Sequence, residues 1–418
     1  MRKTNKAFSF AVFLGLWAAL WSPSSVLGEG PPHERIRYEA IDENGDFTRQ
    51  ITFSVLAVEL DTNEIQSLDS AVIGVETLLD NGPPSNRIDL VIVGDGYTYS
   101  ELSQYANDAE FIAESFFDEE PLRSYASFFN VYRVDVVSAQ SGVDNDPLRG
   151  IEKDTALDMY FWCFDIERLL CIHAGKAKKA AKEAPEVDTI LALANTSKYG
   201  GAGYAPGSVG LATLSARNSA AVELSLHEAG HSIARLVDEY VVSGGAPCWP
   251  SLPNVSRFAF DEMLSKSRKW FRWLDHPNVN TFLGGCYNAT KYYRPTFNSK
   301  MRSLRAPFGE VNSEQFVINF YRFVEPLDDL TPIGTYPKNT TFFVDPVSPV
   351  THGLDIRWFL DGEAIAGENG KTLRVPTEIS KGNHKISVEV VDNTQLVRDE
   401  RKRARWMTAR RTWTVSVP

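Results

Sequence analysis

The apolar run Ile-Asp-Leu-Val-Ile-Val at residues 88–93 limits the choice of fold more than any other segment. A run in which nearly every residue is apolar is typical of a strand that is buried on both faces by helices. Further strand patterns follow at 129–137 and 189–194, and helical patterns lie between them at 100–117 and 166–184. This alternation predicts an α/β unit that is built on a mostly parallel, twisted sheet.

The segments on either side of this unit have a different pattern. Residues 35–60 alternate between apolar and polar side chains around the turn Asn44-Gly45, which predicts a small N-terminal β domain over 29–84. Short alternating strands such as 354–360 and 411–417 predict a C-terminal immunoglobulin-like β-sandwich over 329–418. The α/β unit is therefore expected to occupy 85–328.

The first 28 residues have the pattern of a signal peptide. Three basic side chains precede an apolar run at 7–21, and residues 26–28 are small or tolerated at a cleavage site, so cleavage is expected after Gly28. The run of about 15 residues is shorter than the ~20 that span a bilayer, and no other stretch is long and apolar enough. The sequence predicts a secreted or periplasmic protein without a membrane span.

Charge and cysteine content narrow the functional classes. The 43 Lys and Arg against 54 Asp and Glu give a net charge of −11, which becomes −14 without the three basic side chains of the signal peptide. An acidic chain is a poor match for nucleic acid, so that partner is excluded. The four cysteines predict two disulfides in an oxidising compartment, and among three pairings we favour the local ones, Cys163–Cys171 and Cys248–Cys286.

The sequence His227-Glu228-Ala-Gly-His231 is the motif that carries chemistry. An apolar stripe at alternating steps of four and three predicts a helix that begins near Ser219, with Asn218 as its cap. The stripe consists of Val222, Leu226, Ala229, Ile233 and Leu236. At about 100° per residue the two histidines lie about 40° apart on the opposite side of this helix. Both imidazoles can therefore bind one zinc ion, with Glu228 beside them to hold the attacking water.

The third zinc ligand lies beyond the helical pattern. If the helix continued, Asp238 would lie roughly 10 Å along the axis from His231, too far to share an ion. The chain must therefore turn between these two residues if Asp238 is a ligand.

The motif and its continuation, Leu236-x-Asp238-Glu239-Tyr240, resemble the signature of the IgA peptidase family of secreted, metzincin-like zinc metallopeptidases. Segments 93–98 and 293–302 resemble further motifs of that family, in the same order. The resemblance covers roughly residues 88–323. It implies an α+β metzincin-like catalytic domain in which the zinc ligands are His227, His231 and Asp238.

The resemblance also implies that Met301 forms a turn beneath the metal. The chain departs from general metzincins, which carry Gly seven residues after the first histidine and the third ligand ten residues after it. Here those positions hold Ala234 and Val237, and Asp238 comes one residue later. Glu239 is the alternative third ligand.

Together these features predict a secreted zinc endopeptidase that acts on protein or peptide substrates, with Glu228 as general base. Tyr292 or Tyr293 is the candidate donor to the oxyanion. A Gly-rich loop at 200–204 is expected to lead into an exposed edge strand at 209–214 that could hold an extended substrate. The basic, Trp-containing segment 398–411 could dock on a glycan or cell surface, the alternative being a solvated hairpin.

Two other functions fit the same residues. One is an inactive or weakly active peptidase-like protein that binds host proteins or glycans. The other is a zinc hydrolase of a non-peptide amide.

Overall fold

The computed structural model describes residues 33–41, 47–56, 60–205, 209–243, 245, 248 and 250–418, with the backbone alone for the first two ranges. The predicted signal peptide lies outside these residues. One eight-stranded sheet organises the N-terminal half, in the order β2-β1-β7-β8-β6-β4-β5-β3. Its strands are β1 (His33–Ile41), β2 (Phe47–Leu56), β3 (Val72–Leu79), β4 (Ile88–Asp95), β5 (Phe129–Val136), β6 (Thr189–Ala194), β7 (Gly201–Ala205) and β8 (Gly210–Ser215).

The four central strands β8, β6, β4 and β5 are parallel, and the strands outside them pair antiparallel. Every residue of β4 is buried, because both faces of the sheet are covered. Leu90 and Ile92 enter the core on one face, and Val91 and Val93 enter the core on the other. The apolar run therefore forms the doubly covered strand that the sequence predicted.

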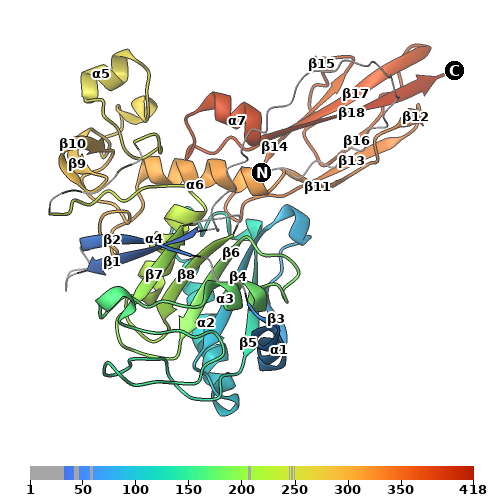
Figure 1. The fold of residues 1–418 in the computed structure, drawn as a ribbon. Helices are drawn as coiled ribbons and strands as arrows, with labels where there is room; N and C mark the ends of the chain where they lie inside the picture. The colour runs from blue at the N-terminus through green and yellow to red at the C-terminus, as the bar shows by residue number, and fades with distance from the viewer. Residues whose placement is uncertain are drawn as a thin grey trace, which may run out of the picture.

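Helices cover both faces of this sheet (Figure 1). The first core contains side chains of α2 (Leu102–Phe116), α4 (Ala221–Ser232) and α6 (Glu310–Phe323), and the second contains those of α1 (Thr62–Ala71) and α3 (Ala174–Ala181). The other α-helices are α5 (Phe260–Ser265) and α7 (Glu400–Trp406). Short 3₁₀ turns are found at Pro84–Asn86, Tyr99–Glu101, Ala126–Phe128, Cys163–Asp165 and Phe271–Trp273.

Three sequence-based expectations differ from this architecture. The N-terminal strands form no separate sheet, because β1 pairs with β7 and β3 pairs with β5, at the two sides of the central sheet. The glycine-rich segment at 200–204 forms strand β7, so β8 is an interior strand rather than an exposed edge. The helix expected over 166–184 is only α3, because residues around Cys171 pair with Tyr160 instead.

Two smaller sheets form the C-terminal part. One contains β11 (Leu327–Leu330), β13 (Thr341–Pro346) and β16 (Thr372–Arg374). The other contains β12 (Thr335–Pro337), β18 (Thr408–Val417), β17 (Gly382–Val391), β14 (Asp355–Leu360) and β15 (Glu363–Ala364). All pairs are antiparallel except β12 with β18, and both sheets share one apolar core that includes Phe342, Trp358 and Trp413.

The C-terminal sheets are tied to the central unit through a buried carboxylate. Asp392, which follows β17, accepts hydrogen bonds from the hydroxyls of Tyr125 at 2.7 Å and Tyr321 at 2.8 Å. Tyr321 belongs to α6, which runs between the central sheet and the C-terminal sheets in Figure 1. Among the described residues, no helix has both the length and the apolar content needed to cross a bilayer.

Candidate metal centre

Helix α4 carries His227, Glu228 and His231, as the periodicity predicted. It begins at Ala221, two residues later than expected, and its N-cap is Ala220. Asn218 still contributes to this helix start, because its side-chain oxygen accepts a hydrogen bond from the Ala220 amide at 3.0 Å. His227 is fully buried. Glu228 and His231 are half-buried, and both line a small cavity between α4 and the sheet.

The chain turns sharply just after this helix. Arg235 has a φ of 56°, a left-handed conformation that is uncommon for a residue with a side chain. The Leu236 amide donates back to the Gly230 carbonyl at 2.9 Å, which closes the turn. As a result Asp238 returns toward the histidines, and the requirement that the helix end before Asp238 is confirmed.

Three potential ligand atoms meet at this point. Oδ1 of Asp238 lies 3.2 Å from Nε2 of His227 and 3.2 Å from Nε2 of His231, and the two nitrogens are 3.1 Å apart. Tetrahedral zinc with bonds of about 2.0–2.1 Å separates its ligand atoms by about 3.4 Å. The three atoms therefore fit three corners of such a tetrahedron, and among the described residues they form the group that could hold a metal ion.

The outer nitrogens of both imidazoles face backbone carbonyls. Nδ1 of His227 lies 3.0 Å from the Lys300 carbonyl, and Nδ1 of His231 lies 2.9 Å from the Leu236 carbonyl. Because a carbonyl oxygen can only accept, each Nδ1 carries the proton and each Nε2 keeps its lone pair. This arrangement directs both lone pairs to the metal position, as is usual for histidine ligands.

A tyrosine that sequence analysis missed contacts Asp238, the candidate third ligand. The hydroxyl of Tyr287 donates a hydrogen bond to Oδ2 of Asp238, and both side chains are buried. The backbone supports this contact, since the amide of Cys286 donates to the Asp238 carbonyl at 2.9 Å. The predicted disulfides Cys163–Cys171 and Cys248–Cys286 are both present, and the second anchors the residue next to Tyr287.

Glu239, the alternative third ligand, is engaged elsewhere. Its Oε1 accepts from the side-chain amides of Asn254 and Asn312, each at 2.9 Å, and its Oε2 accepts from the Ser299 hydroxyl at 2.7 Å. Burial raises the pKa of Glu239 above its ordinary value, although these donors oppose the shift. Glu239 thus joins three segments of the fold beside the metal position.

The segment around Met301 underlies α4, as the resemblance implied. Met301 is fully buried, and its sulfur lies so close to Gly230 that a Cβ there would be 2.5 Å away. Its carbonyl accepts from the Glu239 amide at 2.7 Å. The neighbouring Lys300 is buried and forms ion pairs with Glu223 of α4 and, at 2.7 Å, with Glu119. These contacts fix the carbonyl that orients His227.

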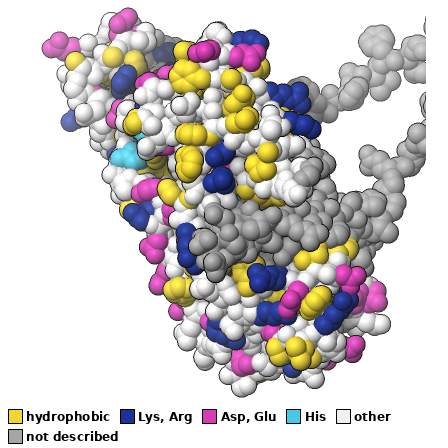
Figure 2. Space-filling model, turned by 90° about the vertical axis from the view of Figure 1, so that its left-hand side faces the viewer, with side chains coloured by type: hydrophobic (Ala, Val, Ile, Leu, Met, Phe, Trp, Pro, Cys, Tyr) yellow, Lys and Arg dark blue, Asp and Glu magenta, His cyan; other side chains and the backbone are white. Residues whose placement is uncertain are grey.

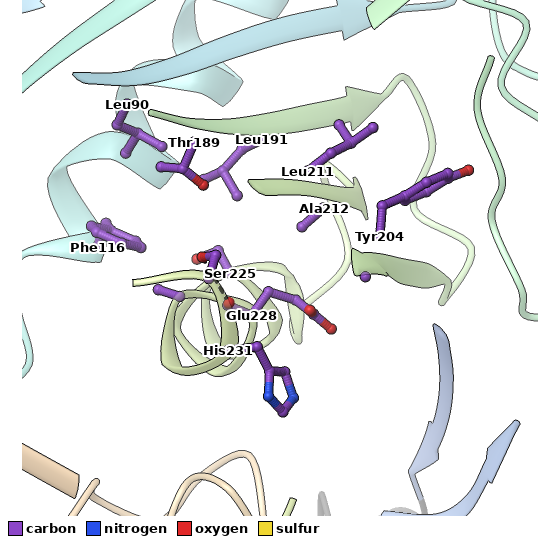
Figure 3. A pocket seen from close by; sticks show the side chains of 13 residues that line it. Leu90, Phe116, Thr189, Leu191, Tyr204, Leu211, Ala212, Ser225, Glu228 and His231 are labelled. Atoms are coloured by element: carbon purple, nitrogen blue, oxygen red, sulfur yellow. Dashed lines mark hydrogen bonds between the residues drawn. The ribbon is translucent and has the colours of Figure 1, made fainter. Parts of the chain in front are cut away.

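The carboxylate of Glu228 lies against strand β7. A Cβ on Gly203 would be 2.1 Å from Oε2 of Glu228, so the absence of a side chain at this position makes room for the carboxylate. In Figure 3, Ser225 points toward the sheet, His231 points to the opposite side of α4, and Glu228 projects sideways between them. The cavity between α4 and the sheet holds only about 20 Å³, space for about one water, so it is not a substrate cleft.

Asp95 at the end of β4 has a structural role. Its carboxylate is fully buried and accepts hydrogen bonds from Ser138, Thr155 and the amides of Leu157 and Met159, at 2.8–3.1 Å. It therefore organises the long loop that follows β5.

The two tyrosines selected from the sequence lie on β10 (Asn288–Arg294), which pairs with β9 (Phe282–Gly285). Tyr293 exchanges backbone hydrogen bonds with Ser256 at 2.8 and 3.0 Å. Tyr292 is buried in an apolar cluster that includes Val237, the residue before Asp238.

Three comparisons with known proteins show what the chain is similar to. Residues 76–278 match the family model described as IgA Peptidase M64. No curated protein sequence matches the chain. Among solved structures, one similar chain is the Bacteroides ovatus mixed-linkage glucan utilization locus protein SGBP-B in complex with a mixed-linkage heptasaccharide.

That likeness has 14% identity and a TM-score of 0.15, and it covers 22% of this chain and 20% of the other. The chain thus spans about a fifth of that structure, and so weak a likeness carries no argument about fold or ligand. The family match covers the central sheet from β3 onward together with α4, Asp238 and α5. Residues 76–278 thus match the IgA peptidase M64 family model, and His227, His231 and Asp238, which lie within them, form a candidate metal site.

Proposed function

We propose that this protein is a secreted zinc-dependent endopeptidase with Glu228 as its general base. The observation that supports this best is the meeting of His227, His231 and Asp238 at 3.1–3.2 Å. Two imidazole nitrogens and one carboxylate oxygen are a donor set typical of catalytic zinc, which keeps a fourth position open. The match of residues 76–278 to a peptidase family model supports a protein or peptide as substrate.

When bound, zinc would supply Lewis-acid polarisation of the water and of the scissile carbonyl. The residues of the chain perform the remaining steps. Glu228, next to His227 on the same helix, accepts a proton from the attacking water and returns it to the leaving nitrogen. Gly203 leaves the space in which this carboxylate lies, and the Lys300 and Leu236 carbonyls keep the imidazoles oriented.

We propose Tyr292 or Tyr293 as donor to the oxyanion that forms at the carbonyl. The position of Tyr292 beside Val237 favours it, because Val237 precedes a metal ligand. Replacing each tyrosine with Phe separates the two: the donor variant is expected to lose about 100-fold in kcat with little change in KM. If neither variant loses activity, the oxyanion donor lies elsewhere.

The same proposal includes the organisation of the chain. Residues 85–328 would form the catalytic domain, and 329–418 would form an immunoglobulin-like module that docks on glycans or a cell surface. Two disulfides support an oxidising location outside the cytoplasm. Export would remove residues 1–28.

Two measurements on the purified chain test the proposed activity. Bound zinc is determined by mass spectrometry, and cleavage sites are mapped in a proteome-derived peptide mixture. Glu228→Ala is expected to keep its zinc and to lose cleavage by at least about 100-fold. Equal cleavage by both proteins would refute the proposed mechanism, and zinc binding without any cleavage by wild type would favour a binding protein on an inactive scaffold. Cleavage of non-peptide amides alone would indicate a zinc hydrolase of such amides instead of a peptidase.

A further inference from the structure

A basic groove lies where the C-terminal helix α7 meets α6 and the end of the active-site helix α4. It encloses about 590 Å³, within the range of small-molecule sites. Seven basic residues and only two acidic residues line it, although the whole chain has a net charge of −11. On the face shown in Figure 2, by contrast, basic and acidic side chains are interspersed. The charge of this groove is therefore a local feature that needs an explanation.

The two acidic residues of the groove are already engaged. Glu314 accepts from Trp273 Nε1 at 2.9 Å and from the backbone amide of Arg398 at 2.7 Å. Asp399 caps α7 by accepting from the amides of Arg401 and Lys402, and it also pairs with Arg272 at 3.3 Å. Both carboxylates are thus already engaged in hydrogen bonds within the fold, and Asp399 also in an ion pair.

Among the described residues, most arginines that line the groove form no ion pair with a carboxylate. The ion pairs of this region use Arg272, Arg398 and Arg403. Within the described part of the chain, no ion pair involves Arg268, Arg322 or Arg401. A group of guanidinium ions without carboxylates costs free energy through mutual repulsion, which a bound anion relieves.

The indole of Trp406 contacts two cations, Arg322 of the groove and Arg405, which lies outside its lining. The guanidinium of Arg322 lies 5.5 Å from the ring centroid and that of Arg405 lies 4.8 Å away. Burial, together with the nearby charges of Arg235 and Arg405, lowers the pKa of Arg322. A cation–π contact positions a guanidinium without neutralising it, so its N–H groups stay available to an oxyanion.

We propose that this groove binds a short acidic glycan through its carboxylate or sulfate groups. Guanidinium groups bind such groups with paired N–H donors. Gln315 lines the same groove and offers an amide for a sugar hydroxyl, and Phe258 offers a ring face. A long polyanion such as nucleic acid fits less well, because the groove is short and the rest of the chain is acidic.

The test uses the full chain with Glu228→Ala, so that the result does not depend on peptidase activity. Calorimetry measures the affinity for a sulfated heparin tetrasaccharide, a carboxylated galacturonate tetramer, neutral maltotetraose and inorganic pyrophosphate. Both acidic sugars are expected to bind at 50 mM NaCl and to bind several-fold more weakly at 300 mM. Maltotetraose is expected not to bind.

In the same background, the double variant Arg268→Gln with Arg322→Gln is expected to weaken binding of the acidic sugars at least about tenfold. Arg374→Gln, an exposed arginine of β16, is the matched control and should have no effect. If the double variant unfolds at a lower temperature, the exposed Arg401→Gln should still weaken binding about threefold. Unchanged affinity in these variants, equal binding of maltotetraose, or binding of pyrophosphate alone would overturn the proposal.

Discussion

Tyr287 and Asp238 form a buried hydrogen-bonded pair in which the tyrosine hydroxyl holds Oδ2 while Oδ1 faces both histidines. The two oxygens of one carboxylate thus have different tasks. One is fixed by the fold, and the other is directed to the metal position. Such outer contacts commonly set how well a metal ligand is oriented.

Tyr287→Phe should therefore weaken zinc binding by about tenfold or more, because Asp238 loses the donor that orients it. Competition with a fluorescent chelator measures the dissociation constant directly. Tyr99→Phe, at a side chain that is 74% exposed, is the control and should bind zinc as wild type does. An unchanged constant in Tyr287→Phe would mean that the backbone alone positions Asp238.

Gly203→Ala should strongly reduce activity while leaving the metal in place. The new methyl group would occupy the position of the Glu228 carboxylate, which can swing away because it ends a flexible side chain. Cleavage should fall by about 100-fold, the usual contribution of a general base, with zinc content unchanged. Gly353→Ala adds a methyl group with nothing within 4 Å and should cleave normally. Full activity of Gly203→Ala would contradict the location of Glu228.

Lys300→Met should destabilise the fold by about 3 kcal/mol, since Glu119 and Glu223 would lose the buried cation between them. Urea unfolding measures the change. Lys371→Met removes an ion pair whose two side chains are more than half exposed, and it should cost less than about 1 kcal/mol. Equal losses in the two variants would show that the Lys300 pairs contribute no more than a surface pair.

Stability should also depend on pH through Asp89. Burial raises its pKa from 3.8 to about 7, so the folded protein keeps a proton that the unfolded chain releases. The contribution is fully present below pH 4 and is lost as pH rises to about 7, with a slope of at most about 1.4 kcal/mol per pH unit. Asp89→Asn should flatten this part of the profile in urea titrations at pH 4 to 8. A slope that persists in the variant would assign the effect to another group.

The sequence predicted β4, β5 and β6 of the central sheet because their signal is local. Strands β4 and β6 are mainly apolar and buried along their whole length, whereas β5 alternates between apolar and polar residues in its second half. Strand partners are not encoded in the same way. Alternation at residues 35–60 indicates strands, but it does not reveal that β1 pairs with β7, which lies far along the chain.

The residues of the candidate metal site show the same difference between local and distant sequence signals. His227, Glu228 and His231 are found from spacing alone because one helix carries all three. Tyr287 is 49 residues from Asp238, and the Lys300 carbonyl is 73 residues from His227. No periodicity links such positions. The predicted Cys248–Cys286 disulfide indicated only that the residue before Tyr287 lies near Cys248.

The left-handed residue at the end of α4 also explains the irregular spacing of the ligands. The turn occurs at Arg235 and the carboxylate comes three residues later, so both are displaced by one position relative to Gly at 234 and a ligand at 237. The distance from turn to ligand is therefore the same, and the difference amounts to a single-residue insertion between the second histidine and the turn. A signature that counts from the turn would find Asp238, whereas one that counts from His227 would stop at Val237 and pass over the site.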